Sequence, residues 1–208
     1  MPEAAYSVVD VETTGLRPSD RIVEVAVRLA DGQGRLLSAF ESVVDPQRRP
    51  GPTWLHGLSA EHCRRAPRFC ELAGEIHRLL VGTVLVAHHL RFDWGFLRRE
   101  FARCDVTFLR EPTGICTSQC SRALGLRGDL KEAAATMGIR RSRRHSAGAD
   151  AATAHELWQE LQRAGASMDA GVPLDPGHGA HRLPVGGAAF VRKPVSDLED
   201  GVTSKAAR

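Results

Sequence analysis

Four acidic residues of this sequence occupy positions that are poorly suited to a purely structural role. Asp10 and Glu12 stand two residues apart within the apolar segment 7–12, and side chains at i and i+2 of a strand share one face. Two carboxylates side by side on a buried face repel each other and lose hydration. An exposed face is the ordinary explanation for one such acid, but two of them, followed by the turn residues 13–15, favour a cation site.

Asp93 and Asp150 extend this pattern to two other segments. Asp93 follows the apolar run 84–87, near the carboxyl end of a predicted strand, where α/β sheets place ligand-binding groups. The structural alternative for Asp93 is an acid in the first turn of a helix, which the helix dipole favours. Asp150 shares the apolar side of a predicted helix with Leu157 and Leu161, and a carboxylate there is unfavourable unless it is paired or bound to a metal.

His145 precedes Asp150 by five residues, which on a continuous helix would turn the two side chains about 140° apart. We therefore expect His145 to lie in the loop before the helix, with its side chain close to the same site. Four carboxylates and one histidine predict a hydrolytic centre with two divalent metal ions. Hard oxygen ligands select Mg²⁺ or Mn²⁺ over zinc, and such a pair can activate a water molecule and stabilise the leaving oxygen of a phosphodiester. A histidine can take the proton of that water.

The segments that hold these residues alternate as in an α/β fold. Strands are predicted at 7–12, 23–29, 36–44, 84–87 and 106–108. Helices are predicted at 69–80, 94–103, 118–124, 130–137 and 147–161. The first three strands favour an antiparallel meander, and the second alternates apolar and polar residues like a half-buried strand. Trp54 and Trp158 are expected in the core, with base stacking as the alternative for Trp54.

The composition excludes several classes of protein. The 208 residues are 42% hydrophobic and 25% charged, an ordinary balance for a globular domain. No apolar stretch is long enough to span a membrane, and the first residues do not resemble a secretion signal, so we expect a cytoplasmic protein. The odd number of cysteines, five, predicts reduced thiols rather than disulfides. The net charge of +3 implies no strongly basic surface.

Three segments carry a resemblance to a known family. Residues 9–16 (VDVETTGL), 86–97 (VAHHLRFDWGFL) and 145–151 (HSAGADA) resemble, in this order, the three motifs of the DEDDh, or DnaQ-like, 3′–5′ exonucleases. The match spans about residues 5–165, and within the family the sequence is most similar to the proofreading epsilon subunits of bacterial DNA polymerase III. The resemblance implies a ribonuclease H-like α/β fold with a mixed five-stranded sheet flanked by helices.

The resemblance also implies a role for each residue of the predicted centre. The metal ligands would be Asp10, Glu12, Asp93 and Asp150. His145 would be the general base, and the reaction would release 5′-mononucleotides from a 3′ end. Thr13, Leu16 and His56 would lie near the terminal nucleotide. His89 stands where the family usually has asparagine, so contacts to the terminal sugar are expected to differ.

A dense group of arginines precedes His145. It comprises Arg140, Arg141, Arg143 and Arg144. We expect Arg143 and Arg144 to bind phosphates of the strand upstream of the scissile bond, because a guanidinium group matches phosphate oxygens. A solvated loop is the alternative explanation for this group.

The sequence therefore predicts a metal-dependent 3′–5′ exonuclease that acts on single-stranded or frayed DNA ends in replication or repair. An RNA exonuclease is an alternative, because the contacts that sense a 2′-hydroxyl cannot be recognised in the sequence. A catalytically silent nucleic-acid-binding module on the same fold is another, which the complete acidic set disfavours. The predicted catalytic domain covers residues 1–165. Residues 166–208, which contain glycine and proline and few apolar residues, predict a flexible tail or a segment that docks on a partner such as a polymerase subunit.

Overall fold

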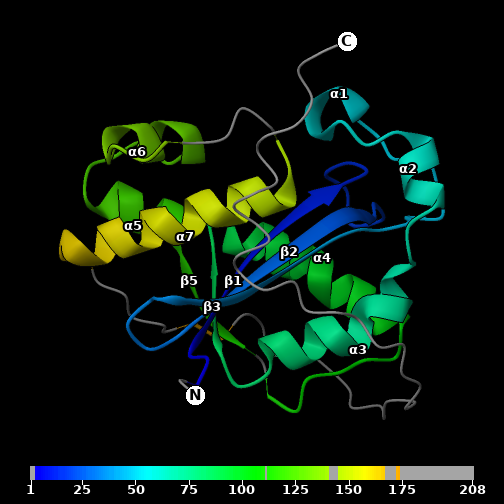
Figure 1. The fold of residues 1–208 in the computed structure, drawn as a ribbon, viewed down its shortest axis with the longest axis horizontal. Coiled ribbons are helices and arrows are strands. Elements are labelled where there is room, and N and C mark those ends of the chain that lie inside the picture. Colours follow the sequence, from blue (N-terminus) through cyan, green and yellow to red (C-terminus); the bar gives the residue numbers. More distant parts are fainter. Residues whose placement is uncertain (1–2, 111, 141–144, 167–171, 174–208) are drawn as a thin grey trace.

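A mixed six-stranded sheet, in the order β3-β2-β1-β4-β5-β6, runs through the middle of the domain (Figure 1). The structure is a computed structural model that describes residues 3–110, 112–140, 145–166 and 172–173. The strands are β1 Tyr6–Thr13, β2 Ile22–Ala30, β3 Leu36–Val43, β4 Val84–Ala87, β5 Thr113–Cys116 and β6 Val172–Pro173. Strands β1, β2 and β3 form the predicted antiparallel meander, and β4 pairs in parallel with β1 and β5. The predicted five-stranded sheet is confirmed, and the two-residue β6 extends it beside β5.

Helices cover both faces of this sheet (Figure 1). The helices are α1 Thr53–His56, α2 Ala60–Arg64, α3 Phe69–Leu80, α4 Leu90–Arg103, α5 Thr117–Ala123, α6 Leu130–Thr136 and α7 Ala147–Arg163. The sequence predicted neither α1 nor α2, and α4 begins before its predicted start. Helix α7 starts where the Ser146 hydroxyl accepts a hydrogen bond from the Ala149 N–H, an ordinary N-cap. It ends before Gly165, whose φ of 80° is a backbone conformation that favours glycine.

The alternation of side chains along β1 and β2 assigns each face of the sheet to different helices. Val9 and Val11 of β1 are buried with residues of α3 and α4, whereas Val8 packs with Trp158 of α7 on the other face. The prediction of a half-buried β2 is therefore wrong, because α7 covers the face that carries Glu24 and Ala26. Contact between Ala26 and the alanines of α7 shows how small side chains bring this helix close to the sheet.

A partly buried ion pair joins α4 to Arg21, the residue before β2. The Arg21 guanidinium donates to both carboxylate oxygens of Glu100, from Nε at 2.6 Å and from Nη2 at 2.9 Å. Glu100 is 1% exposed, and a bidentate pair of this kind fixes both distance and orientation. The pair therefore helps to hold α4, whose first turn carries Asp93, against the sheet.

Two local predictions are wrong. Residues 106–108 form a loop rather than a strand: the Phe108 ring packs against the rings of Trp94 and Phe101, so tertiary contacts bury this apolar segment without strand pairing. Cys70 of α3 and Cys104, which follows α4, form a disulfide with their Cα atoms 5.2 Å apart. The prediction of reduced thiols fails for this pair because α3 and α4 pack against each other, a proximity that the cysteine count does not reveal.

Within the ranges that the structure describes, no helix combines the length and apolar character needed to cross a membrane.

Candidate active site

A cleft of about 220 Å³ lies at the carboxyl end of β1 and β4. The parallel pairing of these strands includes Val8 and Val86 but does not continue beyond them. The residues that line the cleft are Asp10, Val11, Glu12, Leu55, His88, His89, Phe92, Asp93, Leu130, His145 and Asp150. All four predicted metal ligands and the predicted base are among them. The carboxyl end of parallel strands is where α/β sheets ordinarily bind ligands.

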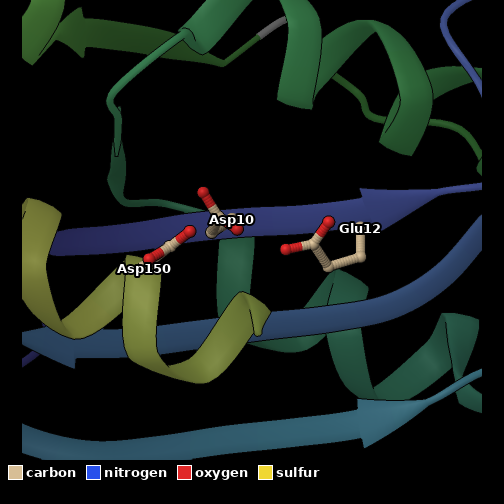
Figure 2. A group of neighbouring side chains, drawn as sticks. All are labelled: Asp10, Glu12 and Asp150. Atoms are coloured by element: carbon tan, nitrogen blue, oxygen red, sulfur yellow. The ribbon is translucent and has the colours of Figure 1, made fainter. Parts of the chain in front are cut away.

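Three of the acidic side chains form a compact cluster. Oxygen atoms from Asp10, Glu12 and Asp150 all lie within 4.8 Å of one another. Asp10 and Glu12 project from β1, and Asp150 reaches toward the strand from α7 (Figure 2). The donor set consists only of carboxylate oxygens, which is the chemistry that hard divalent cations prefer. These residues therefore fit a magnesium or manganese site.

Asp93 approaches the cluster from α4. It is 3% exposed, and its Oδ1 accepts a hydrogen bond of 3.3 Å from the Val11 N–H on β1. Burial raises the pKa of Asp93 to about 7, and the charge of Glu12 adds to this effect while the hydrogen bond from Val11 opposes it. Asp93 is thus fixed beside the strand that carries Asp10 and Glu12.

The electrostatics of Asp10 indicate a site that favours cations. Burial raises the pKa of Asp10 well above its usual value, and the nearby charges of Asp93, Asp150 and Glu12 raise it further. Each of these neighbouring charges disfavours the ionised form of Asp10. A divalent cation would stabilise the ionised cluster, since it supplies the opposite charge.

His145 occupies the loop before α7, as predicted, and lines the cleft. The helix begins two residues later, at Ala147. One short segment of chain therefore carries both His145 and Asp150 to the cleft.

The predicted substrate-binding residues fall in several places. His89 lines the cleft, and the side chain of Leu16 is 83% exposed. Thr13 is buried, with its hydroxyl donating to the Gly15 carbonyl at 2.8 Å. His56 is also buried and hydrogen-bonds within its own loop, to the Pro50 carbonyl at 3.2 Å. Their contacts with a nucleotide stay predictions.

Arg143 and Arg144 lie outside the described residues. Their predicted phosphate contacts stay predictions.

Sequence reasoning missed the role of His88, which connects three segments around the cleft. Its Nε2 donates to the Gly128 carbonyl at 3.0 Å, which leaves Nδ1 to accept from the Thr117 hydroxyl at 3.0 Å. This arrangement uses the neutral imidazole. Burial, together with the neighbouring charge of His89, lowers the pKa of His88 to about 4. The partners lie 29 and 40 residues along the chain, so no local sequence signal identifies them.

Acid is expected to destabilise the protein through His88. Its pKa of about 4 in the folded state lies below the value of about 6.5 in an unfolded chain, so the unfolded chain binds the proton first. Stability should therefore fall as pH decreases from about 6.5 toward 4, by up to about 3 kcal/mol. Urea denaturation at pH 7 and pH 4.5 measures this. The stability difference between the parent and His88→Gln should shrink at the lower pH, whereas the difference for the exposed His62→Gln should not. If the stability difference between the parent and His88→Gln does not change with pH, the lowered pKa assigned to His88 is wrong.

Comparison with known proteins identifies the family. Residues 7–158 match the RNase_T family model, which describes an exonuclease. The chain belongs to this exonuclease family. The match contains the whole acidic cluster and His145, so this exonuclease domain includes the cleft described above.

Individual relatives of the exonuclease domain carry related names. The DNA polymerase III subunit epsilon of Treponema pallidum is 35% identical over 103 residues, covering 48% of this chain and 47% of the relative. The 3′–5′ exonuclease DinG of Staphylococcus saprophyticus is 27% identical over 164 residues, covering 76% of this chain and 18% of the relative. This chain thus spans less than half the length of these relatives.

A solved structure shares the fold of the exonuclease domain. Exonuclease I of E. coli, solved in complex with a dT13 oligonucleotide, matches 77% of this chain and 41% of its own chain with a TM-score of 0.70 and 19% sequence identity. The likeness confirms the α/β fold that the sequence predicted.

Proposed function

We propose that this chain is a metal-dependent 3′–5′ exonuclease that releases 5′-mononucleotides from DNA 3′ ends. The observation that carries the proposal is the convergence of four carboxyl groups and His145 on one cleft, with three of the carboxylates clustered within 4.8 Å. Membership of the exonuclease family supports it, as does the relative named a 3′–5′ exonuclease.

The acidic residues are proposed to hold two divalent ions, Mg²⁺ or Mn²⁺. Asp10, Glu12 and Asp150 supply the clustered oxygens, and Asp93 adds a carboxylate that the Val11 N–H holds in place. When bound, two such ions lower the pKa of a water molecule and neutralise charge on the scissile phosphodiester. His145 then accepts the proton of the attacking water, which is general-base catalysis.

Degradation assays on matched substrates test this proposal. The substrates are single-stranded DNA, duplex DNA and RNA of one sequence, each labelled at the 5′ end and incubated with Mg²⁺, Mn²⁺ or a chelator. The expected result is stepwise, metal-dependent shortening of single-stranded DNA from its 3′ end. Faster shortening of RNA would support the RNA exonuclease instead. Binding of all substrates without cleavage would support a silent binding module, and either result would overturn the proposal.

Exposed apolar side chains near the cleft are proposed to contact the bases of the strand. Trp54 is 84% exposed, so the prediction that it belongs to the core is wrong. It stands next to Leu55, which lines the cleft, on a turn that the buried His56 ties to the Pro50 carbonyl. A rigid exposed aromatic ring beside a nuclease cleft offers a surface on which a base can stack.

Trp54→Ala is therefore expected to raise KM for single-stranded DNA. Stacking contributes about 1–3 kcal/mol per base, so KM should rise roughly 5- to 100-fold while kcat and the melting temperature change little. Steady-state kinetics on a single-stranded oligonucleotide measures the effect. Leu109→Ala is a matched control, because Leu109 is fully exposed in the loop before the amino end of β5, whereas the cleft lies at the carboxyl end of β4, the parallel neighbour of β5. Equal KM values for both variants and the parent would contradict base stacking by Trp54.

Residues 166–208 are proposed to dock on a partner such as a DNA polymerase subunit. The name of the epsilon relative supports this partner class, and the tail composition supports a docking segment. Of these residues, 166 and 172–173 belong to the described part of the chain.

A further inference from the structure

Glu24 of β2 is a buried acidic residue that the proposed mechanism does not use. It is 5% exposed and stands directly opposite Glu12 in the pairing of β1 with β2. Its Oε2 accepts a hydrogen bond of 2.8 Å from the N–H of Ala147, the first residue of α7. Glu24 thus connects the strand beside the acidic cluster with the helix that carries Asp150.

The hydrogen bond satisfies a group that the helix itself leaves unpaired. The first N–H groups of an α-helix have no partner within the helix. In α7, Glu24 binds the N–H of Ala147 and the Ser146 hydroxyl binds the N–H of Ala149. The Ser146 cap comes from the adjacent segment of chain, whereas Glu24 comes from the sheet. Of these two bonds, the one from Glu24 ties the start of the helix to β2.

A second acidic residue supports the position of Glu24. Glu41 of β3 stands opposite Ala26, and its carboxyl group is near enough to Glu24 to raise the pKa of Glu24. Glu41 also lies against the first turn of α7, where a Cβ atom at position 148 would be only 2.0 Å from its Oε2. Gly148 therefore allows the two carboxyl groups and the helix to meet closely.

We propose that Glu24 is a positioning residue for catalysis, which sets the start of α7 so that His145 and Asp150 meet Asp10 and Glu12 in the correct geometry. Ala147, whose N–H donates to Glu24, lies between His145 and Asp150 in the chain. A displacement of this turn moves both side chains relative to β1. Errors of about 1 Å in such an arrangement can lower the rate about 100-fold. The inference rests on the proposed exonuclease function.

Two substitutions of similar size separate this role from general stabilisation. Glu24→Gln keeps a carbonyl oxygen for the Ala147 N–H and adds an amide that can donate to Glu41. Glu24→Leu fills the same space without an acceptor. We expect Glu24→Leu to lower kcat roughly 10- to 100-fold with KM within about 3-fold of the parent, and Glu24→Gln to restore kcat to within about 3-fold.

The control is Asp31→Leu at the other end of β2. Asp31 is also buried, at 4% exposed, and it holds the turn between β2 and β3 by accepting from the N–H groups of Gln33 and Arg35. This variant should lose stability without losing kcat when it is assayed well below its melting temperature. A stability loss alone would then not account for the effect of Glu24→Leu.

A binding measurement tests the same inference without catalysis. Mn²⁺ binding, followed by electron paramagnetic resonance, should be weaker in Glu24→Leu than in the parent, because the Asp150 carboxylate is displaced, and near normal in Glu24→Gln. If Glu24→Leu does not fold, Glu24→Asp replaces it, since the shorter side chain keeps the charge but does not reach the Ala147 N–H.

The outcomes are distinguishable. Parent-like kcat and Mn²⁺ binding in Glu24→Leu, or in Glu24→Asp where it is used, would overturn the positioning role. Equal impairment of Glu24→Leu and Glu24→Gln would also overturn it, since the charge of Glu24 would then matter rather than its hydrogen bond. A parent protein without nuclease activity would refute the proposed function, while the Mn²⁺ measurement would still test Glu24.

Discussion

Asp10→Ala and Asp150→Ala are each expected to abolish exonuclease activity without unfolding the protein. The two carboxylates contribute to the same oxygen cluster from different elements, β1 and α7. Loss of either one removes a ligand and changes the geometry of the bound ions. We expect at least a 10³-fold loss of kcat, which corresponds to about 4 kcal/mol of transition-state stabilisation. Assays of labelled single-stranded DNA with Mg²⁺ and with Mn²⁺ measure it.

The metal-free stability of Asp10→Ala is expected to equal or exceed that of the parent. Burial and four neighbouring acids raise the pKa of Asp10 above its unfolded value of about 3.9. Between these two values the folded protein keeps a proton that the unfolded chain has released, so the parent loses stability as pH rises. The variant has no such group, and its advantage should grow as pH rises above about 3.9. Urea denaturation in the presence of a chelator measures the difference.

Magnesium should reverse this order of stability. An ion that binds only the folded state stabilises it by mass action, and the parent has the intact site. The control is Glu61→Ala, because the Glu61 carboxylate lies on the surface of α2, where it pairs with Arg65, and it should change neither activity nor metal response. Near-normal turnover with full metal dependence in either aspartate variant would show that the assignment of two ions to this cluster is wrong.

The acidic cluster could be predicted from the sequence because an acidic residue within an apolar segment is recognisable without knowledge of its contacts. Asp10 and Glu12 interrupt an apolar strand, and Asp150 interrupts the apolar stripe of a helix. Such positions are unfavourable in isolation, so each residue indicated a ligand before any contact was known. The structure brings all three together. Apolar or β-prone runs also identified β1, β3 and β4, alternation identified β2, and helical spacing of apolar residues identified α3 and α7.

The same reasoning failed for Glu24, which is also an acid within an apolar segment. The alternation Val23, Glu24, Val25 is typical of a strand with one exposed face. The face is buried because α7 covers it, and the position of α7 depends on contacts more than 120 residues away. The disulfide of Cys70 and the partners of His88 were missed for the same reason. The disulfide and the hydrogen bonds of His88 each join segments that are far apart in the sequence, so no short stretch of sequence contains both partners.

His145→Ala is expected to lower kcat by about 10² to 10⁴-fold, the usual contribution of a general base, while metal binding changes little. His145 lines the cleft but is not part of the oxygen cluster, so the ligands for the ions remain. Single-turnover rates on single-stranded DNA and Mn²⁺ binding by electron paramagnetic resonance separate the two effects. His62→Ala, an exposed histidine on α2, is the control and should retain the parent rate.

The pH profile identifies the base more directly than the rate alone. The activity of the parent should rise with pH, because a general base must be deprotonated before it can accept a proton. In His145→Ala the remaining activity should depend on pH much less, and added imidazole should restore part of the rate. An unchanged rate and pH profile in His145→Ala would remove the assignment and leave a site that acts through its metal ions alone.

The comparison of pH profiles must also include His89, because this second histidine lines the cleft as well. Burial and the charge of Arg122 lower the pKa of His89, which favours the neutral imidazole, the form that can accept a proton. The two histidines differ in position: His89 follows β4, whereas His145 precedes the helix that carries Asp150. If His145 is the base, His89→Ala should alter KM through contacts with the terminal nucleotide and keep the parent pH profile. Loss of the pH dependence in His89→Ala, with its retention in His145→Ala, would instead assign the proton transfer to His89.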